Sequence, residues 1–103
     1  MKLIECEDAM LFRGTVFRFK GEYPFCEEYV DFMLCEYPVV TDDNCPLALY
    51  CITGYSAGHL ECVFPIEAKF ENNPNCISKE WLIKNWNKKI YSQCNVDEIE
   101  VII

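Results

Sequence analysis

The chain has 103 residues, of which 51% are hydrophobic and 15% aromatic, and its formal net charge is −8. This composition excludes a disordered chain, because so much apolar surface can be buried that it offsets the lost conformational entropy, and it predicts a single domain over residues 1–103. The negative charge disfavours nucleic acid as a partner.

No apolar run reaches the roughly 18 residues of a membrane span. Acids occupy the place where a signal peptide has its apolar stretch, so we expect a cytoplasmic protein that binds no membrane.

The first two thirds of the chain have the pattern of β-strands. Residues 11–20 end in alternation, with Phe17 and Phe19 on one face and Arg18 and Lys20 on the other. We expect one strand here, in which Gly14 marks a bulge or a bend.

Residues 28–37 form the second predicted strand. Its alternation places three apolar side chains on one face, Val30, Phe32 and Leu34. The other face is expected to carry Tyr29, Asp31, Met33, Cys35 and Tyr37. A turn is predicted over residues 40–46, and residues 46–53 and 59–67 predict two strands that residues 54–58 join as a hairpin.

The pattern changes after residue 70. Residues 71–75 predict a loop and residues 76–92 the one helix, with Ser78 as its N-cap and with Leu82, Trp86 and Ile90 as a buried stripe at four-residue spacing. Residues 96–103 predict a last strand. The sequence therefore predicts an α+β fold, a mostly antiparallel sheet of about five strands with one helix from the C-terminal half packed on a face.

The acids are unevenly distributed along the chain. Residues 21–67 contain nine acids and no lysine or arginine, whereas residues 68–96 contain five lysines and two acids. A long stretch without bases predicts a negative surface, and such a surface steers the association of a basic protein. The residues that we expect at this partner-binding face are Glu27, Glu28, Tyr29, Asp31, Glu36, Tyr37, Asp42 and Asp43. A soluble acidic surface without a partner is the alternative interpretation.

The eight cysteines do not have the spacing of a metal site. Zinc sites favour close cysteine pairs, and the nearest two cysteines here, Cys45 and Cys51, are six residues apart. We expect no metal and no other cofactor. We expect free thiols, since cytoplasmic cysteines are kept reduced, while a set of disulfides stays as the lesser alternative.

No catalytic signature is present. His59 is the single histidine, and neither a Ser nor a Cys motif of the known nucleophile families surrounds it. The four glycines are scattered and form no phosphate-binding loop. We therefore expect no catalytic residues and no enzymatic activity, while an enzyme that uses a cysteine with His59 stays as a lesser alternative.

Two segments carry a family resemblance. The opening MKLIECEDAMLFRGTVFRFKGEYPF and the later ISKEWLIKNWNKKIYSQCNVDE resemble the small bacterial immunity proteins of polymorphic toxin systems, most closely the immunity protein 45 family. In that family, residues such as Trp81 and Trp86 would be packing residues of the helix.

The resemblance implies a function that composition cannot supply. It implies a cytoplasmic antitoxin that binds the toxin domain encoded beside it and blocks that domain's active site or substrate path. A toxin that attacks nucleic acid tends to carry a basic cleft, which the acidic stretch would complement. The alternative function is a small acidic adaptor or nucleic-acid mimic that binds another basic protein.

Overall fold

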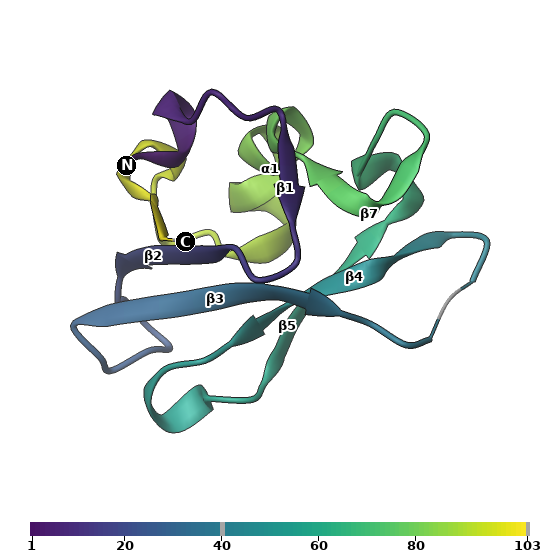
Figure 1. Cartoon of the computed structure of the whole chain (residues 1–103). Helices are drawn as coiled ribbons and strands as arrows, with labels where there is room; N and C mark the ends of the chain where they lie inside the picture. Colours follow the sequence, from purple (N-terminus) through teal and green to yellow (C-terminus); the bar gives the residue numbers. More distant parts are fainter. Residues whose placement is uncertain (40, 103) are drawn as a thin grey trace.

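Two antiparallel β-sheets and a short helix form the fold (Figure 1). The computed structural model describes residues 1–39 and 41–102. The larger sheet has five strands in the order β5-β4-β3-β2-β8, and each pair of adjacent strands is antiparallel. Its strands are β2 (Val16–Lys20), β3 (Tyr29–Glu36), β4 (Asn44–Cys51), β5 (Leu60–Pro65) and β8 (Glu100–Ile102). The predicted fold class, α+β with a five-stranded antiparallel sheet, is confirmed.

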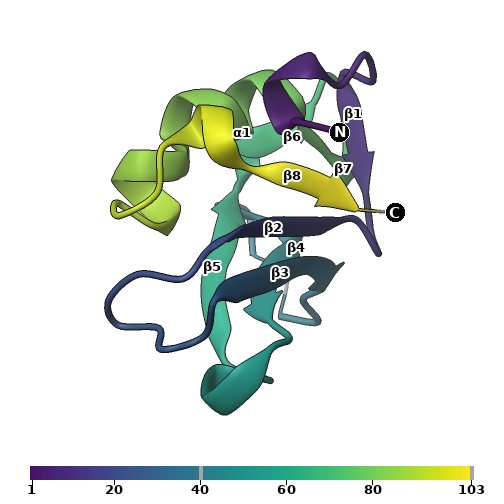
Figure 2. The same ribbon diagram turned by 90° about the vertical axis from the view of Figure 1, so that its left-hand side faces the viewer.

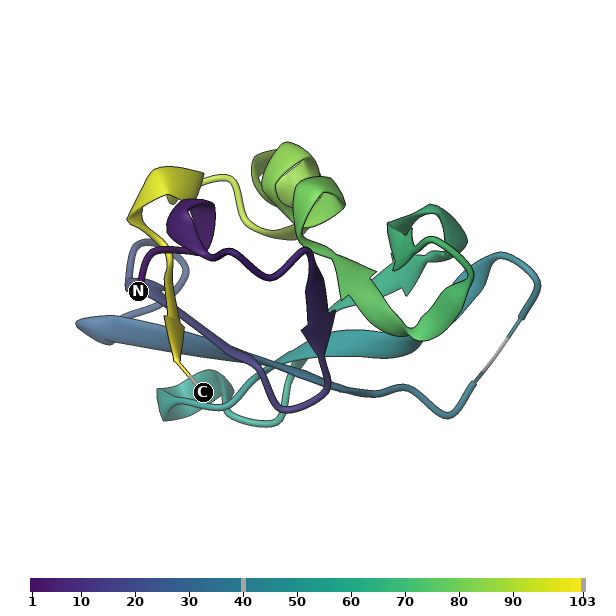
Figure 3. The same ribbon diagram turned by 45° about the horizontal axis from the view of Figure 1, so that its top comes forward.

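A second sheet of three strands, in the order β1-β7-β6, was not predicted. Its strands are β1 (Met10–Phe12), β6 (Lys69–Phe70) and β7 (Asn73–Ser78). The helical elements are the α-helix α1 (Lys79–Asn85), the π-helix η4 (Trp86–Ile90) and four 3₁₀ turns, η1 (Leu3–Glu5), η2 (Gly54–Ser56), η3 (Ile66–Ala68) and η5 (Val96–Glu98). Figures 2 and 3 show α1, η1 and η5 on the same side of the five-stranded sheet.

Aromatic rings fill the space between this sheet and the helix. Trp86 is fully buried, and its ring centroid lies 6.0 Å from Phe17, 5.8 Å from Phe19 and 6.1 Å from Phe32. Edge-to-face and offset ring pairs at such distances add to the free energy of burial. Leu82 of α1 is also fully buried. The predicted stripe on the helix and the predicted inner face of β3 therefore meet in one core.

The chain between residues 11 and 20 is two strands and not one. Gly14 has a φ of +96°, which favours glycine, and it turns the chain from β1 in the small sheet to β2 in the large sheet. The backbone N–H of Gly14 donates to Leu34 O at 2.8 Å, and Leu34 N–H donates to Thr15 O at 2.9 Å. The turn is thus held by β3, and the predicted bend at Gly14 connects two sheets.

The helix begins later than predicted. Cys76 and Ile77 belong to β7 and pair with Phe12 and Leu11 of β1, so residues 73–78 are a strand where a loop and the first helical turn were expected. Ser78 is nevertheless the N-cap, because its Oγ accepts a hydrogen bond from Trp81 N at 3.2 Å. The pairing with β1 satisfies backbone groups that a longer helix would have satisfied by itself.

The last strand is shorter than the predicted residues 96–103: residues 96–98 form η5, β8 spans Glu100–Ile102, and Ile103 lies outside the described residues. Two further predictions concern the β3–β4 and β4–β5 connections. The β4–β5 hairpin is confirmed, and η2 lies within it. In the turn predicted over residues 40–46, Asp42 and Asp43 do lie in a turn, Asn44 already begins β4, and Val40 lies outside the described residues.

Candidate functional site

Most candidate site residues lie in two groups at opposite ends of β3, the strand whose course Figure 1 shows, and Asp31 lies between them. Glu27, Glu28 and Tyr29 lie where β3 begins, and Glu36 and Tyr37 lie where it ends. Seven steps of about 3.3 Å separate the two ends, or roughly 23 Å. The structure therefore does not bring the predicted residues together at one point.

Glu27 is held by the β4–β5 hairpin. Its Oε1 accepts a hydrogen bond from Tyr55 N at 2.8 Å, and this bond is the main reason why the pKa of Glu27 is lowered from its ordinary value of 4.5. Gly54, with a φ of +63°, makes this close approach possible, since a Cβ there would lie 1.8 Å from the same oxygen. Glu27 thus fixes the hairpin to the loop before β3.

Exposed tyrosines surround this end of the sheet. Tyr29 is 56% exposed and Tyr55, beside Glu27, is 100% exposed. Glu28 is exposed as well and has no ion-pair partner among the described residues. Tyrosine side chains are enriched in protein interfaces because they offer a large rigid surface with a polar tip.

Asp31 lies in the middle of β3, and its charge is neutralised. Arg18 of β2 stands directly opposite in the register, and its guanidinium donates to both carboxylate oxygens of Asp31, at 2.8 and 2.9 Å. The Asp31 side chain is only 9% exposed, and the hydrogen bond with Asp31 raises the pKa of Arg18. The distribution of charges along the chain did not indicate this pairing, because Arg18 precedes the acidic stretch of residues 21–67 in the sequence.

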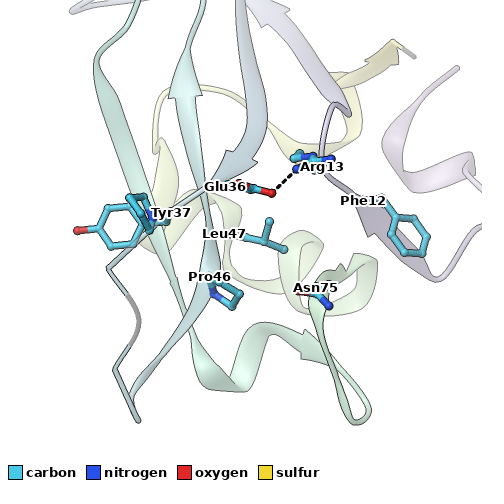
Figure 4. A pocket seen from close by; sticks show the side chains of 8 residues that line it. Phe12, Arg13, Glu36, Tyr37, Pro46, Leu47 and Asn75 are labelled. Atoms are coloured by element: carbon cyan, nitrogen blue, oxygen red, sulfur yellow. Dashed lines mark hydrogen bonds and ion pairs between the residues drawn. The ribbon is translucent and has the colours of Figure 1, made fainter.

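Glu36 and Tyr37 line a groove, which we call the Glu36 groove (Figure 4). Its volume is about 510 Å³. Glu36 forms an exposed ion pair with Arg13, and the wall opposite Tyr37 includes Phe12, which is 50% exposed. The remaining lining residues are Pro38, Pro46, Leu47 and Asn75. Phe12 and Arg13 were not predicted here, because their place next to β3 depends on the turn at Gly14.

Asp42 and Asp43 lie in the connection from β3 to β4. Both are exposed, and neither has an ion-pair partner in the part of the chain that the structure describes. Asp43 O accepts a hydrogen bond from Ile66 N at 2.9 Å, which holds the loop next to the end of β5. These two acids, with Glu28, are the predicted acids whose side chains make neither an ion pair nor a hydrogen bond with the described residues.

The described residues give little support to catalysis or metal binding. They contain no cluster of three or more His, Cys, Asp and Glu side chains that could hold a metal ion. His59 is an exposed residue whose Nδ1 lies 3.2 Å from Glu61 Oε2. The eight cysteines are free thiols, and burial raises the pKa of Cys62 and Cys94 to about 11, which keeps both protonated at neutral pH.

A comparison with protein families decides the identity. The family model for immunity protein 45 matches residues 3–101. The chain belongs to the immunity protein 45 family. Comparisons with curated proteins and with solved structures gave no match.

Family membership agrees with the type of site that the structure offers. An immunity protein acts by binding a toxin, and the family therefore points to a surface for a protein partner. The exposed tyrosines, the free acids and the Glu36 groove are features of such a surface. No helix that the structure describes combines the length and the apolarity needed to cross a bilayer.

Proposed function

We propose that this protein is the cytoplasmic antitoxin of a bacterial polymorphic toxin system, which binds one cognate toxin domain and blocks it without catalysis. The observation that carries the proposal is the match to the immunity protein 45 family over residues 3–101. The toxin in this proposal is a nuclease with a basic substrate cleft. The formal net charge of −8 supports it, because opposite charge speeds the encounter of two proteins.

The acids that face the toxin in this proposal are those with free charge. Glu28, Asp42 and Asp43 are exposed and unpaired within the described residues. Asp31 is buried against Arg18, Glu36 is paired with Arg13, and Glu27 is bound to the hairpin, so these three serve the fold more than the encounter. Tyr29 and Tyr37 contribute contact area.

The first experiment tests the antitoxin function itself. The chain is expressed together with the C-terminal domain of the protein encoded immediately upstream, and cell survival is measured with and without it. We expect protection and a one-to-one complex in size-exclusion chromatography with light scattering. A chain that neither protects nor binds that domain, but binds another basic cellular protein, would identify an acidic adaptor and contradict the proposal.

A second experiment tests the acidic surface. The triple variant Glu28→Lys, Asp42→Lys, Asp43→Lys is expected to slow association by about tenfold or more at low salt, with a much smaller effect at about 0.5 M salt because the charges are then screened. The matched control reverses three exposed acids in η1 and the segment after it, on the helical side of the sheet, Glu5, Glu7 and Asp8. If both triple variants slow association equally, net charge alone acts and the surface has no special role.

A further inference from the structure

The five-stranded sheet has one face that no helix covers. Figure 3 shows α1, η1 and η5 above β2, β3 and β4, and among the described residues the only helical element below these strands is the short η2 turn at one end. Side chains of adjacent residues in a strand point to opposite faces. Since Phe17, Phe32 and Leu49 point into the core, their neighbours Val16, Met33 and Tyr50 point to this second side, which we call the open face.

An unbroken apolar row crosses the open face from edge to edge. Directly opposed residues of neighbouring strands share a face and contact each other. The register pairs Ile102 with Val16, Val16 with Met33 and Met33 with Tyr50, and Tyr50 with Leu60 after a register shift between Leu49 and Tyr50. The row thus takes one residue from each of the five strands. Leu60 is 38% exposed and the other four are half-buried.

A second row lies beside the first, toward the end of β3. Cys35 pairs with Ala48, and Ala48 with Val63, so this row is also free of charge. Two adjacent rows without a charged side chain are unusual for a sheet face that meets water, since the exposed face of an antiparallel sheet is normally polar. Contiguous exposed apolar patches mark interaction sites. Ala48 is fully buried, so the exposed patch here consists of the first row together with Cys35 and Val63.

The third row is charged, but its charges are paired. Arg18 stands between Glu100 and Asp31 in the register, and both oxygens of Asp31 bind the Arg18 guanidinium. Glu100 pairs with the N-terminal amino group and with Lys2. The charges of this row are therefore compensated within the molecule. Lys20, the next residue of β2 on the same face, lies opposite Tyr29 and has no ion-pair partner among the described residues. The free acids Glu28, Asp42 and Asp43 lie in the loops beyond the ends of the face.

This arrangement matches the anatomy of a protein interface, with an apolar centre and a polar rim. Four strand spacings of about 4.8 Å and seven residue steps of about 3.3 Å give a face of roughly 19 by 23 Å, or about 440 Å². A standard interface takes about 800 Å² from each partner. The loops at both ends of β3, with Tyr29, Tyr55 and the free acids, supply the remaining area.

We propose that the open face is the centre of the toxin-binding interface and that the acidic loops are its rim; this inference rests on the proposed antitoxin function. A second copy of this chain is the competing occupant. Two copies would bring together two molecules with a net charge of −8 each, and their acidic rims would repel. A positively charged toxin, by contrast, is attracted by the acidic rim while it contacts the apolar rows.

The test separates the centre from the rim by kinetics. The variants are Tyr50→Ala and Leu60→Glu on the open face, and the matched control is Ile4→Glu on η1, where Ile4 is 46% exposed. Binding to a catalytically inactive form of the toxin domain encoded upstream is measured by biolayer interferometry, and folding by thermal melting. We expect each open-face variant to weaken binding by about 30-fold or more, through faster dissociation, and the control to bind like the wild type.

Each outcome decides the inference. If folded Tyr50→Ala and Leu60→Glu bind within about twofold of the wild type, the open face is not the centre of the interface. If Tyr50→Ala melts early, the edge variant Leu60→Glu decides alone. Sedimentation of the free wild type is expected to give a monomer, and a dimer that Leu60→Glu dissociates would assign the face to a second copy. A wild type that neither binds nor protects would instead refute the antitoxin function.

Discussion

The two faces of the five-stranded sheet are both largely apolar, yet they differ in what covers them. The inner face carries Phe17, Phe19 and Phe32, which pack on Trp86 and are at most 1% exposed. The open face carries Val16, Met33 and Tyr50, which lie opposite one another in neighbouring strands and are half-buried. Alternation separates the two faces of a strand, but it does not say that the second face meets water.

The largest expected effect is the loss of an inner-face ring. Phe19 lies against Phe25, Phe32, Trp86 and Tyr91, with ring centroids 4.9 to 6.3 Å away. Phe19→Ala is expected to lower the free energy of unfolding by about 3 to 5 kcal/mol, because it leaves a cavity in a rigid cluster. Met33→Ala on the open face is expected to lower it by only about 1 kcal/mol. Urea unfolding at equilibrium measures both, and equal losses would contradict the distinction between the faces.

A smaller effect distinguishes the half-buried ion pair of Arg18 and Asp31 on the open face from the exposed pair of Arg13 and Glu36 in the Glu36 groove. Asp31→Asn is expected to lower the free energy of unfolding by about 1 to 3 kcal/mol, since it weakens two charge-assisted hydrogen bonds in a half-buried place. Glu36→Gln removes an exposed partner of Arg13 and is expected to change it by no more than about 0.5 kcal/mol. The same urea experiment compares the two. If Glu36→Gln lowered the free energy of unfolding more than Asp31→Asn does, the ion pair in the Glu36 groove would stabilise the fold more than the ion pair in the sheet.

The next prediction concerns acid pH and the loop beside the open face. Tyr55 N–H lowers the pKa of Glu27, so this carboxylate stabilises the folded state above pH 4.5 and loses that contribution as the pH falls through its lowered pKa. Glu80 beside Lys84 and Glu100 beside the N-terminus act in the same direction.

The variant Glu27→Gln, which lacks the carboxylate charge, tests this pH-dependent stabilisation. The variant is expected to melt at a lower temperature than the wild type at pH 7, and the two melting temperatures should approach each other as the pH falls below 4.5 and through the lowered pKa of Glu27. Thermal melting followed by circular dichroism across this range measures the difference. A difference that stays constant with pH would mean that the charge of Glu27 is irrelevant to the hairpin.

The smallest effect is chemical and leaves the fold unchanged. Cys26 is exposed in the loop before β3, Cys35 lies half-buried on the open face, and Cys51 is fully buried on the inner face. Burial also raises the pKa of Cys35. Iodoacetamide is therefore expected to label Cys26 first, Cys35 more slowly and Cys51 last, as peptide mass spectrometry would show.

Alkylation also tests what covers the open face. Bound toxin is expected to protect Cys35 further, because Cys35 lies in the second apolar row. Equal labelling of Cys35 with and without toxin would place the toxin elsewhere, and a hyper-reactive cysteine in the free protein would favour an enzyme.

Much of the fold could be predicted because it depends on local patterns. Alternation identified the inner residues of β3, and Ser78 and the stripe of Leu82 and Trp86 identified the helix. The small sheet could not be predicted, because β1 and β7 are joined by a pairing between residues 10–12 and 76–78, which no local pattern records. The same pairing explains why the helix begins later than expected.

The candidate site was predictable in part. The sequence indicated an acidic region, and Glu28, Asp42 and Asp43 are exposed acids without ion-pair partners among the described residues. It did not indicate that Arg18 and Arg13 neutralise Asp31 and Glu36, because these partners come from neighbouring segments in space.

By itself, the sequence determined the strand alternation, the capped helix, the net charge of −8 and the family. The alternation and the helix cap depend on residue types at short spacing, and the net charge and the family depend on the sequence as a whole. The tertiary structure alone decided which acids keep a free charge and which apolar residues line up across five strands. Both depend on strand register, and register is set by contacts between residues that are far apart in the chain.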